Sequence, residues 1–298
     1  MTRKTSAAAV AFVALLGGTV FAQEPPPEYQ QVLTALGKTG DFKDNVLKVN
    51  LPRNDVKVTV AGVDTPTPFG FGGWVALTKA SDGSQVLMGD LVLLEDEVNP
   101  VMSALLDNGF DVTALHNHFF RDEPHMFYMH VHGHGAAADL ARRLKPVVDL
   151  FGKGRGPVPQ TSANQLDTAK LAQIVGHPGE QSGAVYKITI GRDDLKMTEM
   201  GATINARMGL NTWAAFTGTN DKAAIAGDVA MIASEVTPVL KALRRNGLEV
   251  VAIHHHMTSD RPMVIFLHYW GTGPAETLAT GFKAAVNELG KHGAASNR

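Results

Sequence analysis

The sequence predicts an α+β fold built from two tandem homologous units. A histidine-containing segment occurs twice at a constant offset of 138 residues, as Ala114–His118 and again as Ala252–His256. Each copy follows segments with the β-branched content of strands and one segment with helical spacing. The order strands, helix, hairpin, helix indicates a mainly antiparallel sheet with two helices in each unit.

Composition excludes several classes of function. With 44% hydrophobic and 19% charged residues, the chain of 298 residues is typical of a globular protein with a real core. The 27 basic and 29 acidic residues leave no basic field, so we expect no nucleic acid partner. Cysteine is absent, so no disulfide forms and a metal site must use nitrogen, oxygen or thioether ligands.

The N-terminus has the pattern of a secretory signal peptide. Arg3 and Lys4 precede the apolar stretch Ala7–Leu16, and the small residues at Val20–Ala22 favour cleavage following Ala22. The apolar stretch is short for a membrane span, and no cysteine can carry a lipid anchor. We expect a soluble mature protein, periplasmic or secreted, without a membrane anchor.

The repeat sets the domain organisation. Trp74 matches Trp213 at an offset of 139, so one residue was gained or lost between this region and the histidines. The stretch between the copies is rich in glycine, proline and polar residues, as linkers are. The expected parts are a signal peptide at 1–22, a first repeat unit at 23–151, a linker at 152–168 and a second repeat unit at 169–298.

The first half of each unit is predicted to hold strands and a helix. In the first unit the strands are expected at Val56–Val60, Trp74–Leu77 and Gln85–Leu94. Helical spacing follows over Glu97–Asn108. Pro100 and its match Pro238 are expected in the first helical turn, and Gly109 and Gly247 at the left-handed C-terminal position.

The second half of each unit is predicted to be a hairpin and a closing helix. One strand reaches Phe120, a turn covers Arg121–Pro124, a return strand runs over Met126–His132, and a helix covers Leu140–Leu150. The hairpin strands Phe110–Leu115 and Val264–Trp270 are apolar on both sides, which predicts central positions in their sheets.

Three histidines recur in register in the two copies, and they are the candidate metal ligands: His116, His118 and His130, and separately His254, His256 and His268. Residues two apart on a strand share a face, so His116 and His118 point the same way. Whether His130 joins them depends on hairpin register. Pairing of even-numbered residues sets His130 across from His116, whereas a slip of one residue sends it to the other face.

Three convergent imidazoles with an open fourth position are typical of catalytic zinc, and imidazole also suits copper, nickel and iron. Zinc is the first expectation and copper the second. Further candidate ligands are His125 and His132, together with the thioethers of Met126, Met129 and Met257, which would favour Cu(I). Histidines on a strand can equally be structural, each hydrogen-bonded to a buried carboxylate or carbonyl.

The segments that carry a family resemblance are Gly89–Asp90, Glu97–Val98, Asn108–Gly109, Ala114–His118, Glu235–Val236 and Ala252–His256. In these segments the chain resembles the LppY/LpqO-like family of exported bacterial proteins, over about Tyr29 to Leu289. The resemblance implies an exported protein of a family whose function is largely unknown. The chain differs from the lipoproteins of that family in lacking a lipid-bearing cysteine, and His255 replaces the Asn117 of the first copy, so the two sites need not be equivalent.

Three functions remain open at this point. The preferred hypothesis is an exported protein that binds or sequesters a transition metal. The first alternative is a metal-dependent hydrolase, in which a metal-bound water attacks and Glu97 or Glu235 is the candidate base, although both fit equally as first-turn acids favoured by the helix dipole. The second alternative is a non-enzymatic envelope module, a ligand-binding protein or scaffold with structural histidines.

Overall fold

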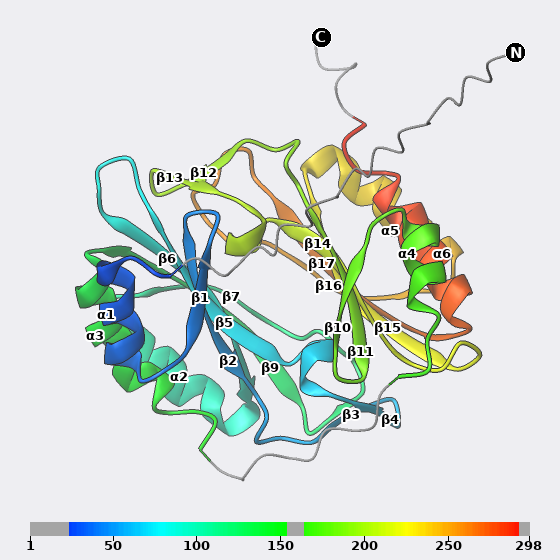
Figure 1. Cartoon of the computed structure of the whole chain (residues 1–298), viewed down its shortest axis with the longest axis horizontal. Helices are drawn as coiled ribbons and strands as arrows, with labels where there is room; N and C mark the ends of the chain where they lie inside the picture. Colours follow the sequence, from blue (N-terminus) through cyan, green and yellow to red (C-terminus); the bar gives the residue numbers. More distant parts are fainter. Residues whose placement is uncertain (1–23, 154–163, 292–298) are drawn as a thin grey trace, which may run out of the picture.

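Each repeat unit forms one six-stranded antiparallel sheet covered by helices, as a computed structural model shows for residues 24–153 and 164–291. The predicted signal peptide and most of the predicted linker lie outside the described residues. The two sheets face each other, and the helices of the two units lie on opposite sides of the molecule (Figure 1). The α+β fold of two tandem units is thereby confirmed.

The first unit contains three helices and one main sheet. Its helices are α1 (Pro27–Leu36), α2 (Glu95–Asp107) and α3 (Ala137–Val148). Its strands are β1 (Gly40–Lys43), β2 (Val46–Pro52), β5 (Gly72–Lys79), β6 (Gln85–Leu94), β7 (Asp111–His116) and β9 (Met126–Gly135), in the spatial order β1-β2-β5-β6-β9-β7. The short strands β3 (Val58–Val60), β4 (Val63–Thr65) and β8 (Asp122–Glu123) form a separate three-stranded arm, and the 3-10 turn η1 covers Thr67–Phe69.

The second unit repeats this topology. Its helices are α4 (Thr168–Val175), α5 (Ala233–Arg245) and α6 (Ala275–Val286). Its strands are β10 (Gly179–Ser182), β11 (Val185–Gly191), β14 (Asn211–Gly218), β15 (Ala223–Met231), β16 (Glu249–His254) and β17 (Ile265–Gly273), in the order β10-β11-β14-β15-β17-β16. The arm is β12 (Met197–Glu199) with β13 (Ala202–Ile204), and η2 covers Ala206–Met208.

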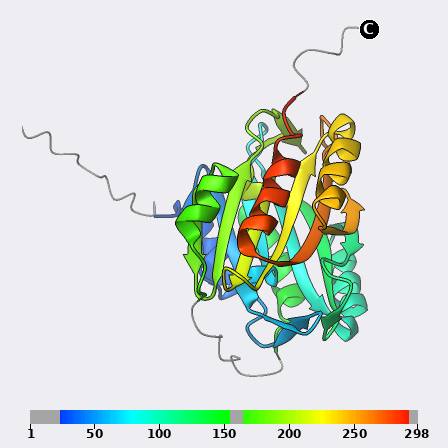
Figure 2. The ribbon, with the colours of Figure 1, turned by 90° about the vertical axis from the view of Figure 1, so that its right-hand side faces the viewer.

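Alternation along the strands gives each sheet two different faces. In the first unit, odd-numbered side chains such as Leu47, Val75 and Leu91 form one core with the three helices. The corresponding core of the second unit lies under α4, α5 and α6, which cover the outer face of its sheet (Figure 2). Each fully buried aliphatic side chain stabilises the fold by about 1.5–3 kcal/mol, so these outer faces hold each unit together. The even-numbered side chains of the first sheet point toward the other unit.

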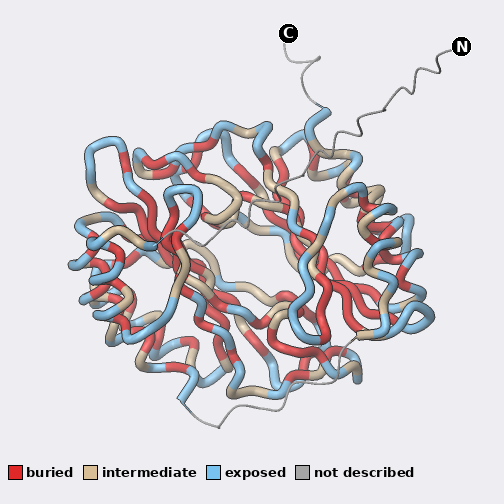
Figure 3. Tube along the Cα trace, viewed as in Figure 1, coloured by how far each residue is buried: buried red, intermediate tan, exposed pale blue. Residues whose placement is uncertain are grey.

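The two inner faces are joined by two mixed apolar clusters. One combines Val46 and Met88 of the first sheet with Ile204 and Phe266 of the second unit. The other combines residues of the first arm, including Val58 and Val60, with second-unit residues that include Trp270. Each arm therefore covers part of the opposite unit's inner face, and buried segments run along the strands between the exposed helix surfaces (Figure 3).

The structure differs from the predicted elements at the hairpin, where β7 ends at His116 rather than Phe120 and the predicted turn Arg121–Pro124 contains β8, and in three further respects. The short amphipathic helices α1 and α4 were not predicted, so each unit has three helices. Helices α2 and α5 begin at Glu95 and Ala233, so Pro100 and Pro238 lie inside the helix, beyond its first turn. The acidic side chain at the third helical position sets this early start, because Glu97 accepts the Leu94 N–H at 2.8 Å.

The third difference concerns the strand that carries His116. Strand β7 is an edge strand of its sheet, as is β16, so the predicted central position of Phe110–Leu115 is wrong, while β17 is central as predicted. Strands β7 and β16 lie beside each other across the junction of the units. The apolar character of β7 therefore reflects cover from the second unit rather than two flanking strands.

Among the described residues, no helix is long and apolar enough to cross a membrane.

Candidate metal centre

Hairpin register places the histidines of each copy on the inner face. Ala114 pairs with His130, and His116 pairs with Tyr128, so even-numbered residues oppose one another. The second copy has the same register, with Ala252 opposite His268. The partner of His130 is therefore Ala114 rather than His116, but His130 and His116 share one face as diagonal neighbours.

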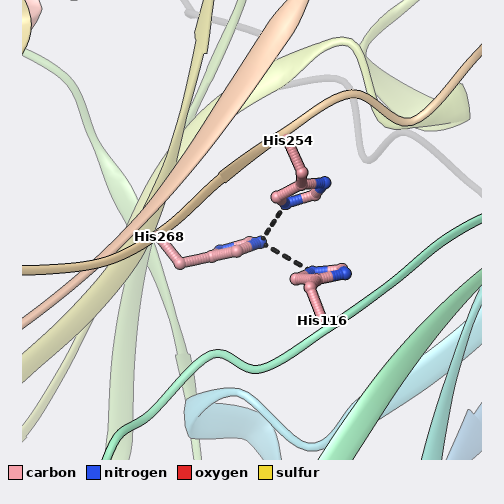
Figure 4. Close-up of side chains that lie close together, drawn as sticks. All are labelled: His116, His254 and His268. Carbon is pink, nitrogen blue, oxygen red and sulfur yellow. Dashed lines mark hydrogen bonds between the residues drawn. The ribbon is translucent and has the colours of Figure 1, made fainter.

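The six histidines of the two copies meet at the junction of the units, and we call them the histidine cluster: His116, His118, His130, His254, His256 and His268. The Nε2 of His268 lies 2.8 Å from the Nε2 of His254 and 3.1 Å from the Nε2 of His116 (Figure 4). His116 comes from β7 of the first unit, whereas the other two come from β16 and β17 of the second.

Groups of nitrogens close enough to share an ion mix the two copies. One group is His116, His254 and His268, and another is His130, His254 and His256, with all ligand atoms of each group within 4.8 Å of one another. The sequence suggested one triplet for each copy. The structure instead brings together one histidine of the first copy with two of the second, because the edge strands β7 and β16 of the two sheets lie beside each other.

His118 and its match His256 lie further along the same junction. The ring of His118 stacks on Tyr128 with centroids 3.3 Å apart and on His268 at 3.6 Å. His256 stacks on Phe266 at 3.4 Å and on His130 at 3.9 Å. His118 belongs to none of the ligand groups found among the described residues, so it is placed as a neighbour of the centre.

The ring nitrogens of the cluster are poorly satisfied within the described residues. Buried nitrogens without a hydrogen-bond partner there are His116 Nδ1, His118 Nε2, His130 Nε2, His256 Nε2 and His268 Nδ1. A ring nitrogen offers one hydrogen or one lone pair, so His268 Nε2 cannot form two good hydrogen bonds at once. The structural alternative, in which each histidine bonds a buried carboxylate or carbonyl, describes part of the cluster, since His254 Nδ1 lies 3.3 Å from the His255 carbonyl and His130 bonds the backbone of Gly89. It does not account for the five nitrogens named above.

Burial keeps the cluster neutral. Burial, followed by the neighbouring histidines, lowers the pKa of His116, His118 and His256 well below the usual range. Burial lowers the pKa of His254 to about 4. Neutral imidazole is the form that binds a metal ion, so these ligands need not lose a proton near neutral pH.

A carboxyl group adjoins the histidines in each unit. Asp90 pairs with His130 across β6 and β9, and Asp228 pairs with His268 across β15 and β17. Burial raises the pKa of Asp90 to about 7, and burial raises the pKa of Asp228 well above its usual value. Asp228 forms a third potential ligand group with His256 and His268.

A cavity of about 970 Å³ opens beside the cluster, lined by residues of both units, and we call it the inter-unit cavity. His118 and His256 line it. Its other polar and aromatic lining residues include Lys48, Asn50, Trp74, Asp90, Lys187, Thr189, Trp213 and Asp228. A ligand in this cavity can therefore reach two members of the histidine cluster.

The remaining predicted site residues lie elsewhere. Glu97 accepts two hydrogen bonds from Arg53, at 2.6 and 3.2 Å, and Glu235 accepts two from Arg192, at 2.8 and 2.9 Å. Both carboxylates also accept the backbone N–H at the start of their helix. They are therefore held as ion-pair partners and helix caps, as the alternative interpretation of first-turn acids expects, and not as free bases.

The other candidate ligands of the first copy also fall outside the ligand groups. His125 is exposed and lies 2.9 Å from Asp122, whereas His132 is buried 3.7 Å from Glu199. The candidate thioethers, those of Met126, Met129 and Met257, all lie in apolar core clusters.

Lys48 and Lys187 are matched residues of the repeat, as are Trp74 and Trp213 and also Asp90 and Asp228, but repetition alone does not connect these pairs with the histidines. Their cross-strand order reveals the connection. Trp74, Asp90 and His130 occupy adjacent positions on β5, β6 and β9. Alternation predicts which residues of one strand share a face, whereas the register that sets these side chains beside one another across strands is decided by the structure.

A family model described as Domain of Unknown Function (DUF1259) matches residues 30–150 and again residues 169–288. The chain belongs to this family. The two matches correspond to the two units, so the DUF1259 repeat is the unit of the fold. The resemblance to the LppY/LpqO-like family stays a prediction.

No curated protein matches the chain. Two solved structures show a weak likeness. EtuB from Clostridium kluyveri has 10% identity and a TM-score of 0.21, covering 85% of this chain and 91% of that one. The double-ringed trimeric shell protein MSM0271 from the RMM microcompartment has 16% identity and a TM-score of 0.19, covering 68% and 82%. These scores are too low to carry an argument about function.

Proposed function

We propose that this DUF1259 protein binds a transition-metal ion at the junction of its two units, with zinc first and copper second. The observation that carries the proposal is the convergence of the His116 and His254 Nε2 atoms on that of His268. Two nitrogens bound at about 2.0–2.1 Å to a tetrahedral ion lie roughly 3.3 Å apart. The 3.1 and 2.8 Å separations are close to that value.

Donor chemistry narrows the choice of metal. The group contains imidazoles with an adjacent carboxyl and no thiolate, which suits zinc and copper better than calcium or magnesium. The candidate thioethers lie in the apolar cores, which removes the main argument for Cu(I). Zinc is therefore the preferred ion.

The test is elemental analysis of the full chain purified from its native compartment. We expect close to stoichiometric zinc or copper in the wild type and its loss in the double variant His116→Ala, His268→Ala. His125→Ala is the matched control, because this exposed histidine belongs to none of the ligand groups among the described residues. Metal-free wild type that also fails to take up either ion in dialysis would overturn the proposal.

A metal-dependent hydrolase is the second candidate, and the inter-unit cavity favours it. A metal-bound water beside His118 and His256 would face a space large enough for a substrate. Asp90 or Asp228 replaces the glutamates as candidate base, because both glutamates pair with arginines. Hydrolysis of a chromogenic ester panel by the zinc-loaded protein, lost in Asp228→Asn, would support this function. Inactivity of the loaded protein toward the panel would leave metal binding alone.

The proposal includes export of the protein. Residues 1–22 have the charge and apolar pattern of a signal peptide. N-terminal sequencing of protein recovered from the periplasm or medium is expected to begin at Gln23. An intact Met1 on cytoplasmic protein alone would contradict export.

A further inference from the structure

Two lysines of the inter-unit cavity form no direct ion pair within the described residues, although Asp41, Asp90 and Asp228 attract them at longer range. Lys48 on β2 and Lys187 on β11 occupy matched positions in the two units, and both are half-buried. Their Nζ atoms lie over the rings of Trp74 and Trp213, at 4.6 and 3.9 Å from the centroids. Within the described residues, neither lysine side chain takes part in a hydrogen bond or in an ion pair.

The environment of these ammonium groups is unfavourable in the free protein. Burial lowers the pKa of Lys48 and of Lys187 to about 8, and at Lys187 the repulsion from Lys48 adds to the lowering. A cation–π contact compensates only part of the lost hydration, about 0.5–2 kcal/mol. A buried charge is normally paired by direct contact, so two lysines that lack such a contact and face a cavity are suited to bind an anion there. Burial raises the pKa of the neighbouring Asp90 and Asp228, which favours their neutral form.

We propose that the inter-unit cavity binds a small organic dicarboxylate, with one carboxylate on Lys48 and the other on Lys187. The inference goes beyond metal binding, because it stands on the lysines and the cavity rather than on the histidines. The cavity of about 970 Å³ matches the size of pockets that enclose small organic ligands. Asn50, Asn54 and Asn211 also line it and can donate to carboxylate oxygens.

Charge matching favours carboxylates over phosphates. Each lysine supplies one positive charge, which equals the charge of one carboxylate, whereas a phosphate group carries close to two negative charges. Phosphate sites usually add an arginine fork or a helix N-terminus. Arg207, the one arginine that lines the cavity within the described residues, is paired with Asp41.

The inter-unit cavity adjoins part of the histidine cluster. His118 and His256 line the same cavity as the two lysines. The arrangement suits a protein that holds an organic acid and a metal together.

Isothermal titration of the full chain with succinate, glutarate and adipate tests the proposal, with butyrate as the monocarboxylate control. We expect at least one dicarboxylate to bind, and its affinity to fall on the order of tenfold or more in Lys48→Met and in Lys187→Met. Lys57→Met is the matched control, because Lys57 is exposed and pairs with Asp64. Quenching of tryptophan fluorescence by the ligand gives a second measurement, since each lysine lies over a tryptophan.

The metal-free protein and the double variant His116→Ala, His268→Ala separate this proposal from the metal site. Retained dicarboxylate binding in both supports the lysine assignment even if no metal is found. Binding of the metal without binding of any of the three dicarboxylates overturns the present inference and leaves the proposed function standing. Equal affinity in wild type, Lys48→Met and Lys187→Met also overturns it, with circular dichroism showing that the variants are folded.

Discussion

Two kinds of buried polar cluster, an arginine cluster in each unit and the histidine cluster at the junction, differ in how well their hydrogen bonds are satisfied. In the arginine cluster, Arg53 donates to Asp55, Glu97 and the Val92 carbonyl. In the histidine cluster, five buried ring nitrogens have no hydrogen-bond partner within the described residues. Both kinds of cluster are built from residues that match between the two copies of the repeat. Satisfaction of hydrogen bonds distinguishes a structural network from a site that is completed by a ligand.

Removing an arginine should have the largest effect on stability. Arg192→Met leaves the fully buried Glu235 without its ion-pair partner. We expect the free energy of unfolding to fall by about 3–5 kcal/mol, measured by urea denaturation. The folded protein should keep its metal content. Loss of metal from folded Arg192→Met would show that the two clusters are not independent.

Removing one histidine should weaken metal binding strongly and change the stability of the metal-free protein little. His116→Ala takes one nitrogen from the group that includes His254 and His268. Affinity for zinc should fall about 100-fold or more, measured by competition with a chromophoric chelator. The metal-free variant should unfold within about 1 kcal/mol of the metal-free wild type, because the deleted ring has unsatisfied nitrogens. Unchanged zinc affinity would remove His116 from the site.

Acidification should destabilise the metal-free protein. Because burial lowers the pKa of the clustered histidines below 6.5, the unfolded chain binds protons at these positions before the folded chain does. This contribution to stability is fully present above pH 6.5 and is lost as the pH falls toward 4. Each such histidine contributes a slope of up to about 1.4 kcal/mol per pH unit.

The buried carboxyls oppose this trend. Burial raises the pKa of Asp90 and Asp228, so the folded chain takes up protons there in the same pH range. The six histidines outnumber these two groups, so the net stability should fall on acidification. Urea denaturation at several pH values checks this, and His118→Gln with His256→Gln should flatten the slope. A slope of opposite sign would mean that the histidines are charged in the fold.

The smallest effect is expected at the more exposed carboxylate of the arginine clusters. Glu97 is 15% exposed whereas Glu235 is 0% exposed, although both pair with an arginine. Glu97→Gln keeps the shape and part of the hydrogen bonding, so we expect a loss of about 1–2 kcal/mol in the free energy of unfolding. Glu235→Gln should cost more. Equal losses in the two variants would show that burial does not set the strength of these pairs.

Local patterns predicted the local structure well. The strand Gln85–Leu94 has the predicted bounds, and Gly109 and Gly247 adopt the predicted positive φ of 69° and 76°. The start of α2 was misplaced because Glu97 caps the helix two residues after its first residue, so an acid inside the helix was taken as its beginning.

The candidate site was predicted only in part. Strand periodicity predicted that His116 and His118 share a face, but β7 ends at His116, so His118 lies beyond the strand. The hairpin register, which the sequence left open, places His116 and His130 on one face. The pairing of His116 with His268 joins residues 152 apart in the chain, and no local period encodes it. Lys48 and Lys187 were recognisable as matched residues of the repeat, but the sequence did not show that both line one cavity.

The sequence by itself determined that there are two homologous units, that their histidines recur in register, and that no cysteine takes part. Tertiary structure decided that the six histidines form one cluster instead of two separate triplets. The physical reason is that strand periodicity specifies which face a side chain occupies, whereas the partner of that face depends on how the two sheets pack. Edge strands β7 and β16 meet at the junction, so the ligand groups include nitrogens from both units.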